Sequence, residues 1–274
     1  MDLFSYSLFL EGFLSAFFIA LSTSLIGFFL LIKRLAMLGA GLSHAAFGGI
    51  AIALLLDVDP IAFTVLYTVL LGLFIQFLVD KKSLPADTVV ALFFSLGVAL
   101  AIIILGMTEN LGANVFSYLF GSMLTASTLD LLLSFLIFLL TITFILFNYR
   151  SLLLLSFNEE LSKLRGVRVE LLNYLLISIA SANVVLSIKA VGLVLSASFI
   201  SIPAMTSLMV STSFLQSLML SAIFSFLSLF FGIALALVAD LPPSGAVVAC
   251  MVFMFLLVAF GRFMFKFLRI EKSG

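Results

Sequence analysis

The feature that most constrains this chain is a series of nine long apolar runs, separated by short segments that hold most of its charges. A hydrocarbon core about 30 Å thick needs about 20 apolar residues per helix, and in lipid a helix satisfies its own backbone. Of all residues 64% are hydrophobic, against roughly 45–50% in soluble domains. The sequence therefore predicts an all-α, polytopic transmembrane helical bundle. The runs cover approximately residues 7–32, 36–56, 61–79, 88–106, 128–147, 171–187, 190–209, 215–239 and 245–264.

The seventh run leaves the helix count open between eight and nine. Pro203 interrupts it, and a proline can break a membrane helix into a re-entrant segment. The chain starts with MDLFSYSLFLEG, which lacks the basic start of a secretory signal, so we interpret the first run as a membrane helix. We expect residues 1–274 to form a single transmembrane domain.

Basic residues predict how the bundle sits in a cell membrane. Short cytoplasmic loops collect Lys and Arg. With nine spans and an external N-terminus, four basic clusters fall on the cytoplasmic side, together with the C-terminus, and only Lys189 lies elsewhere. The opposite face receives acidic residues, and an acidic mouth favours cations, although each could be an ordinary solvated carboxylate. These acidic residues are Asp2, Asp57, Asp59, Glu109, Asp130 and Asp240.

The longest predicted cytoplasmic segment, residues 148–170, contains a short charged helix. Its acidic start and basic end complement the helix dipole, and an asparagine and a glycine are suited to its two caps. The helix is too short to span a membrane. It either lies at the membrane surface or docks a soluble partner. The residues that define it are Asn158, Glu159, Glu160, Lys163, Arg165 and Gly166.

The only histidine, His44, lies in the segment GLSHAAFGG within the second run. On a helix it shares one face with Ala40. The adjacent face carries the small residues Gly41, Ala45 and Gly49, which allow another helix to approach closely. An ionisable residue inside a membrane span indicates a functional site, and an imidazole suits a divalent metal. The alternative is a neutral imidazole that pins two helices through a hydrogen bond to a backbone carbonyl.

Two further segments carry polar or irregular sequence. KAVGLVLSASFISIPAMTS, residues 189–207, has hydroxyl groups that either line a pathway or bond back to their own helix. FSYLFGSMLT, residues 116–125, is too short to span and predicts a half-helix at the outer mouth. The candidate pathway-lining residues are Ser196, Ser198, Ser201 and Pro203.

The sequence contains none of the motifs that support an enzyme. It has no GxxxxGK[ST] phosphate loop, no HExxH and no GxSxG. A single cysteine, Cys250, permits no intrachain disulfide. We therefore expect a conduit that holds no cofactor permanently.

Five segments, in order and spacing, resemble the membrane permeases of ATP-binding-cassette importers for zinc, manganese or iron. The combination of G-x-x-x-S-H-x-x-x-x-G with V-G-x-x-x-x-x-x-x-x-x-I-P is the most specific part, and the resemblance covers most of the chain. The segments are GAGLSHAAFGGIAIALLLDVDP (39–60), YLFGSMLTAS (118–127), LSKLRGVR (161–168), KAVGLVLSASFISIPAMTS (189–207) and ADLPPSGAVV (239–248).

The resemblance implies a type II importer-like permease that works as a homodimer. It implies two ATP-binding subunits on the cytoplasmic side and an extracytoplasmic metal-binding protein at the outer mouth. Residues 158–168 resemble the coupling helix that engages the ATP-binding subunit, and His44 falls on the metal-pathway histidine. The transported cation would be zinc or manganese, with iron as a third option.

One position departs from the family pattern. Many members carry an aspartate four residues before the histidine, and this chain has Ala40 there. The site would then lack a hard oxygen ligand, which predicts weaker binding and a softer preference. Either a distant carboxylate substitutes, or the site is weak, or the cargo differs. The candidate carboxylates are Glu109, Asp130 and Asp240.

Two other classes of function stay open from the residues alone. A secondary transporter or channel would work without an ATPase and is favoured by inverted repeats, of which the sequence shows no convincing sign. A membrane-embedded enzyme or an assembly factor is the second alternative.

Overall fold

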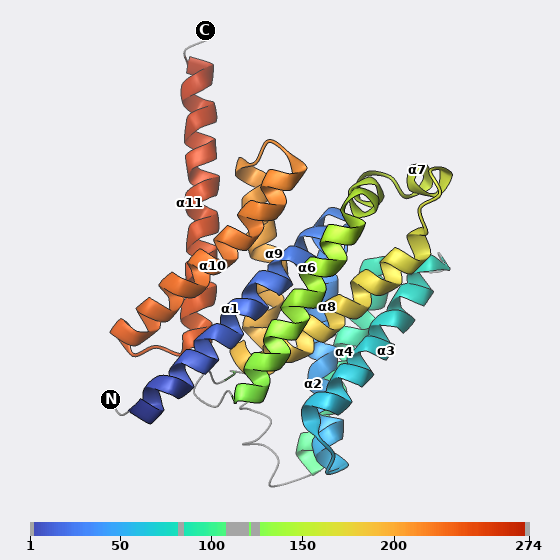
Figure 1. The fold of residues 1–274 in the computed structure, drawn as a ribbon, viewed down its shortest axis with the longest axis vertical. Helices are drawn as coiled ribbons and strands as arrows, with labels where there is room; N and C mark the ends of the chain where they lie inside the picture. Colours follow the sequence, from blue (N-terminus) through green and yellow to red (C-terminus); the bar gives the residue numbers. More distant parts are fainter. Residues whose placement is uncertain (1–2, 82–84, 108–120, 122–126, 272–274) are drawn as a thin grey trace.

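The computed structural model describes residues 3–81, 85–107, 121 and 127–271, and this part of the chain is helical with no strand (Figure 1). Two of the predictions cannot be compared with it. Glu109 lies outside the described residues, and so does the predicted half-helix at 116–125 except for residue 121. The helices are α1 (Leu3–Ile32), α2 (Ala36–Leu55), α3 (Pro60–Asp80), α4 (Ala86–Met107), α6 (Thr128–Phe157), α7 (Glu159–Leu164), α8 (Val169–Val191), α9 (Leu193–Val210), α10 (Phe214–Ala239) and α11 (Pro243–Glu271).

Nine helices of the described chain are long and apolar enough to cross a membrane, which confirms the predicted bundle. Pro203 lies inside α9 without breaking it, so nine of the described helices, and not eight, are candidates to cross the membrane. The largest difference from the prediction is at α6, which continues to Phe157, ten residues beyond its apolar run. The first part of the predicted loop at 148–170 is therefore helix.

Local sequence signals explain where several helices begin. Ser127 and Asp130 form a reciprocal capping box at the start of α6. The Asp59 side chain accepts a hydrogen bond from the Ala62 amide at 2.7 Å, and Pro60 follows it at the first position of α3. These caps fix helix ends that propensity alone would leave open.

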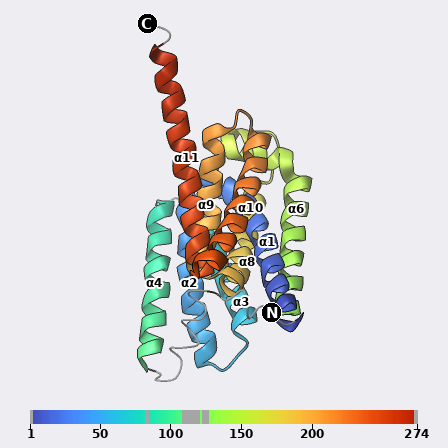
Figure 2. The ribbon, with the colours of Figure 1, turned by 90° about the vertical axis from the view of Figure 1, so that its left-hand side faces the viewer.

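The bundle places α2 at its centre, where it packs against α1, α3, α4, α8 and α9. Figure 2 shows α4 and α6 on opposite sides of the bundle. Hydroxyl groups of α10 tie that helix to α1: Ser225 donates to the Ala20 carbonyl at 2.8 Å, and Ser221 donates to the Ser24 carbonyl at 3.2 Å. Hydroxyl ties and small residues are the usual means of helix association in lipid.

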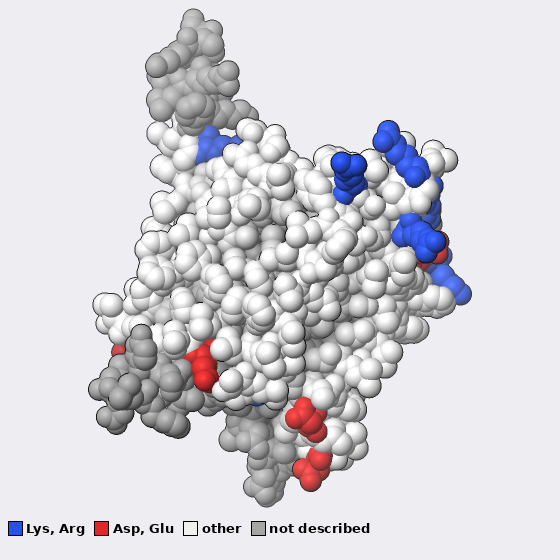
Figure 3. Space-filling model, in the orientation of Figure 1, with Lys and Arg blue, Asp and Glu red and all other residues white. Residues whose placement is uncertain are grey.

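Charged side chains gather at the two ends of the bundle and leave the middle apolar (Figure 3). We call them the basic end and the acidic end, and Lys189 is the exception among the cations. The basic end carries Lys33, Arg34, Lys81, Arg150, Lys163, Arg165, Arg168 and Arg262, alongside several carboxylates. The acidic end carries Glu11, Asp57, Asp59, Asp130 and Asp240.

Candidate functional site

In the middle of α2, His44 lies on a strip that the other described helices leave partly uncovered. Between Leu38 and Ala51 every residue of α2 is buried except Ala40 and His44, which are partly exposed. The two residues are one helical turn apart on the same face. The position that lacks the family's aspartate therefore shares the accessible strip with the histidine.

Glycines allow α4 to pack closely against α2 beside His44. A side chain at Gly97 would lie 2.5 Å from both the His44 carbonyl oxygen and the Ala45 Cα, and one at Gly48 would lie 2.8 Å from the Gly97 carbonyl oxygen. The predicted face of small residues on α2 contacts two helices. Gly41 lies against Val90 of α4, whereas Gly49 lies against Tyr67 of α3. The helices approach so closely because no Cβ separates them.

The imidazole of His44 packs against the ring of Phe94, with 4.2 Å between ring centroids. Within the described residues neither ring nitrogen makes a hydrogen bond or an ion pair. The helix-pinning hydrogen bond that sequence left as an alternative is thus absent from the described part of the molecule. The described contact that positions the ring is therefore apolar.

The candidate lining residues of α9 divide into two groups. Ser198 and Ser201 are partly exposed, whereas Ser196 and Pro203 are buried. The Ser196 hydroxyl bonds that of Ser187 on α8 and lies 3.5 Å from that of Ser43 on α2, so it ties three helices together. The Ser198 hydroxyl donates to its own helix, at the Val194 carbonyl, at 3.0 Å.

The candidate carboxylates do not gather around His44 in the described structure. The Asp130 carboxylate pairs with the Lys189 ammonium at 2.7 Å and also caps α6, while Asp240 is exposed at the turn between α10 and α11. No group of three His, Cys, Asp or Glu side chains suited to a metal ion occurs among the described residues.

At the basic end, α7 is fixed by a polar cluster. The Asn158 side chain accepts from the Leu161 amide at 3.0 Å, which confirms the predicted cap, and Gly166 adopts a positive φ of 78° just beyond the helix. The Lys33 ammonium lies 2.9 Å from the Glu159 carboxylate and also donates to the side chain of Asn173. The cluster joins α7 to the end of α1 and to α8.

Electrostatics favour this cluster in its charged form. Burial alone would raise the pKa of Glu159, but hydrogen bonds from Lys33 and Asn173 and the positive charge of Lys33 outweigh it and lower the pKa. The Lys33 side chain is only 8% exposed, so an unpaired ammonium there would be costly. The sequence did not predict Lys33 and Asn173 as partners of Glu159, although an asparagine within an apolar helix is a signal of such a contact.

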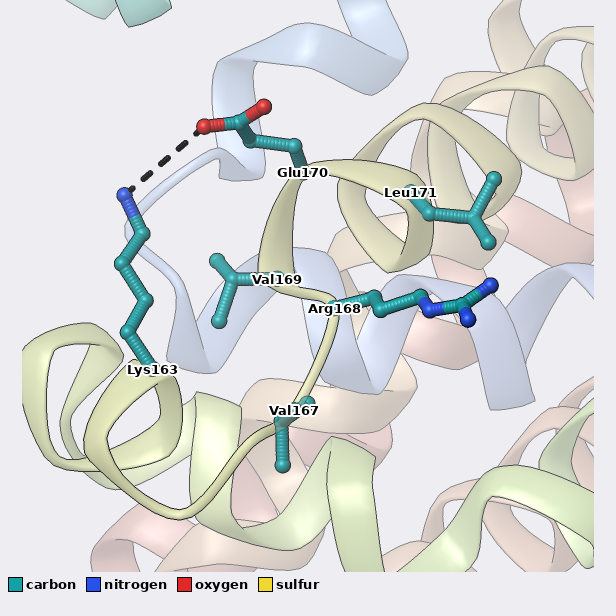
Figure 4. Close-up of a pocket in the computed structure, with 6 residues that line it drawn as sticks. All are labelled: Lys163, Val167, Arg168, Val169, Glu170 and Leu171. Carbon is teal, nitrogen blue, oxygen red and sulfur yellow. Dashed lines mark ion pairs between the residues drawn. The ribbon is translucent and has the colours of Figure 1, made fainter.

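The exposed surface of α7 carries apolar side chains among its charged ones. Leu164 is 85% exposed and Leu161 is 46% exposed, and Phe157 at the end of α6 is 76% exposed. Glu160 and Arg165 are exposed beside them, and the Lys163 ammonium lies 4.0 Å from the Glu170 carboxylate (Figure 4). The surface around α7 therefore combines exposed apolar and charged side chains.

A match to a known family decides what kind of chain carries these features. The model of the ABC 3 transport family matches residues 5–262. This chain belongs to that family. The predicted class is confirmed: the chain is a multi-pass permease subunit of an ABC transporter and not itself an enzyme, since ATP hydrolysis takes place on a separate subunit.

Curated relatives align along most of the chain. A probable metal transport system membrane protein of Treponema pallidum is 30% identical over 240 residues, which cover 88% of this chain and 90% of that protein. The high-affinity zinc uptake system membrane protein ZnuB of Haemophilus influenzae is 26% identical, covering 91% and 95%. The manganese transport system membrane protein MntC of Halalkalibacterium halodurans is 26% identical, covering 90% and 85%.

Two solved structures share the fold. PsaBC from Streptococcus pneumoniae in complex with Fab superposes with a TM-score of 0.80 at 22% identity, covering 90% of this chain and 89% of that one. An inward-facing putative metal-chelate type ABC transporter superposes with a TM-score of 0.72 at 24% identity, covering 92% and 85%. The arrangement of helices is therefore that of known ABC permeases.

Proposed function

We propose that this chain forms, as a homodimer, the translocation pathway of an ATP-driven importer for a divalent metal cation. The observation that carries the proposal is the strip of α2 on which His44 alone offers a metal ligand and makes no hydrogen bond to the described residues. The names of the relatives, which are zinc and manganese transport proteins, support a metal cargo.

Zinc is the favoured cargo, ahead of manganese and iron. An imidazole nitrogen suits zinc, whereas manganese prefers carboxylate oxygens, and Ala40 supplies none. One histidine from each copy of a dimer would bind the cation only weakly. Weak binding suits a conduit, because an ion that is held too tightly is not released.

The remaining candidate residues take supporting roles. Ser198 and Ser201 line the accessible face of α9, and buried Ser196 and Pro203 set the shape of that helix. Asp240 attracts cations to the acidic end, and Glu109, which lies outside the described residues, stays a candidate from the sequence alone. Asp130 lies at the same end, but the ion pair with Lys189 balances its charge, so it attracts cations less.

The basic end faces the cytoplasm in this proposal, with the N-terminus outside, and α7 is the coupling helix. An ATP-binding subunit docks on Leu161, Leu164 and the adjacent charged side chains, and an extracytoplasmic binding protein delivers metal at the opposite end. Movement of α7 passes through the Glu159–Lys33 ion pair to the end of α1. The tight turn after α1, where Arg34 has a φ of 62°, leads directly into the helix that carries His44.

ATP-dependent uptake of zinc, manganese and ferrous iron into vesicles tests the proposal. The vesicles hold this chain with its candidate ATP-binding subunit and binding protein, and wild type is compared with His44→Ala. We expect zinc uptake to collapse in His44→Ala because the pathway loses its only imidazole. Ser43→Ala, a change at the neighbouring buried position, is the control and is expected to keep most of the uptake.

Each outcome has a distinct meaning. Unchanged uptake in His44→Ala would remove the histidine from the pathway. Absence of ATP-dependent uptake of all three metals by the wild type would contradict the metal cargo itself.

A further inference from the structure

A groove on the membrane-facing side of the bundle has the chemistry of a lipid site. Its walls come from α6 and α8. It is lined almost entirely by apolar side chains, with one exposed aromatic ring, Phe147, that is 86% exposed. The lining residues are Leu136, Leu139, Leu140, Thr143, Phe144, Phe147, Asn148, Leu175 and Ile179.

Both walls of this groove end in an exposed arginine. On α6 the strip Thr143, Phe147 continues one turn further to Arg150. On α8 the strip Ile179, Leu175 leads back through Leu171 to Arg168 at the cap of the helix.

The side chains near Arg168 leave it free for an external anion. Figure 4 shows Arg168 and Leu171 on the same side of the chain, away from Glu170, which faces Lys163. Among the described residues, no ion pair involves Arg168 or Arg150. Two exposed guanidinium groups at the end of an apolar groove offer donors to an anion, and guanidinium groups match phosphate geometry.

The depth of the arginines fits a phospholipid head group. Arg150 lies 22 residues after the start of α6, which corresponds to about 33 Å of helix and so to about the thickness of the hydrocarbon core. The groove runs from that level toward the middle of the membrane. We propose that the groove binds one anionic phospholipid of the leaflet at the basic end, with an acyl chain along α6 and α8 and its phosphate between Arg150 and Arg168.

The absence of tryptophan from the chain permits a specific test. Phe147→Trp places a single fluorophore in the groove, and Met219→Trp places one on the exposed face of α10, a helix without a basic residue, as a matched control. The full chain is reconstituted in phosphatidylcholine vesicles that contain either brominated phosphatidylglycerol or brominated phosphatidylcholine at equal fractions. Because each basic residue near an anionic surface strengthens lipid association by roughly fivefold, we expect stronger quenching of the groove reporter by the brominated anionic lipid. The control reporter should be quenched equally by both.

Charge variants in the Phe147→Trp chain complete the test. Arg150→Gln with Arg168→Gln should abolish the preference for the anionic lipid, and Arg168→Gln alone should reduce it. Lys81→Gln with Arg165→Gln, which removes the same charge from exposed positions outside the groove, should leave it intact. Equal quenching of the groove reporter by both lipids, or a preference that survives loss of both arginines, would overturn the proposal. Loss of the preference on adding inorganic phosphate would assign the arginines to a free anion instead.

Discussion

The helix that carries His44 and the short helix α7 at the basic end are held in place by opposite means. Close backbone contact with α4 fixes α2, and no described polar group holds the imidazole. A side-chain cap, an ion pair and an asparagine fix α7. The difference is that the pathway residue stays free to exchange ligands, whereas the docking helix is bound firmly to α1 and α8. A transporter needs both properties in one bundle.

The largest expected effect comes from breaking the packing of α2. Gly97→Val would place a side chain against the backbone of His44 and Ala45, so we expect a loss of stability of about 3 kcal/mol or more and little folded protein. Gly106→Val is the control on the same helix, because no atom lies within 4 Å of a side chain built there. Thermal unfolding in detergent measures both. Equal stability of the two variants would show that close α2–α4 contact is not what positions His44.

An intermediate effect is expected from breaking the cluster at α7. Lys33→Ala leaves Glu159 and Asn173 without their shared partner, which should cost about 1 to 2 kcal/mol and uncouple ATP hydrolysis from uptake. The measurement is the amount of metal moved per ATP hydrolysed. Lys81→Ala, an exposed lysine at the same end, should leave that ratio unchanged. If Lys33→Ala transports with normal coupling, the path from α7 through α1 is wrong.

The smallest expected effect is a difference in stability between two serine variants of α9. Ser196→Ala removes a hydroxyl that joins α9 to α8, and interhelical hydrogen bonds in membranes contribute about 0.6 kcal/mol on average. Ser198→Ala removes only a bond within its own helix, so stability should hardly change. Thermal unfolding midpoints compare the two variants. A larger loss in Ser198→Ala would reverse the assignment of buried and exposed faces.

The sequence predicted the elements well because their signals are local. Each of the nine runs corresponds to a described helix long and apolar enough to cross a membrane, and Asn158 caps α7 as its position before two glutamates indicated. It could not predict how each helix is rotated, because a helix that is apolar on every side carries little information about which face meets its neighbours. Ser196 and Ser198 were therefore grouped together, although one is buried between helices and the other faces outward.

Contacts between distant residues were beyond the sequence for a related reason. Lys33 and Glu159 are 126 positions apart, and nothing in the sequence around either residue indicates that the two form an ion pair. Phe94 is one of 32 phenylalanines, and nothing in its surroundings singles it out as the ring beside His44. The glycines at positions 48 and 97 were the available signal for close approach, but they do not say which helices meet.

Accessibility of the α2 strip tests the central claim most directly. In a Cys250→Ala background, single cysteines at position 44 and at the buried position 42 are treated with a water-soluble thiol reagent in the assembled importer, with and without zinc. The account predicts that His44→Cys reacts, that Leu42→Cys does not, and that zinc slows the reaction at position 44 because a thiolate binds it. Equal resistance of both positions, or a reaction at position 44 that zinc leaves unchanged, would contradict a metal pathway along this strip.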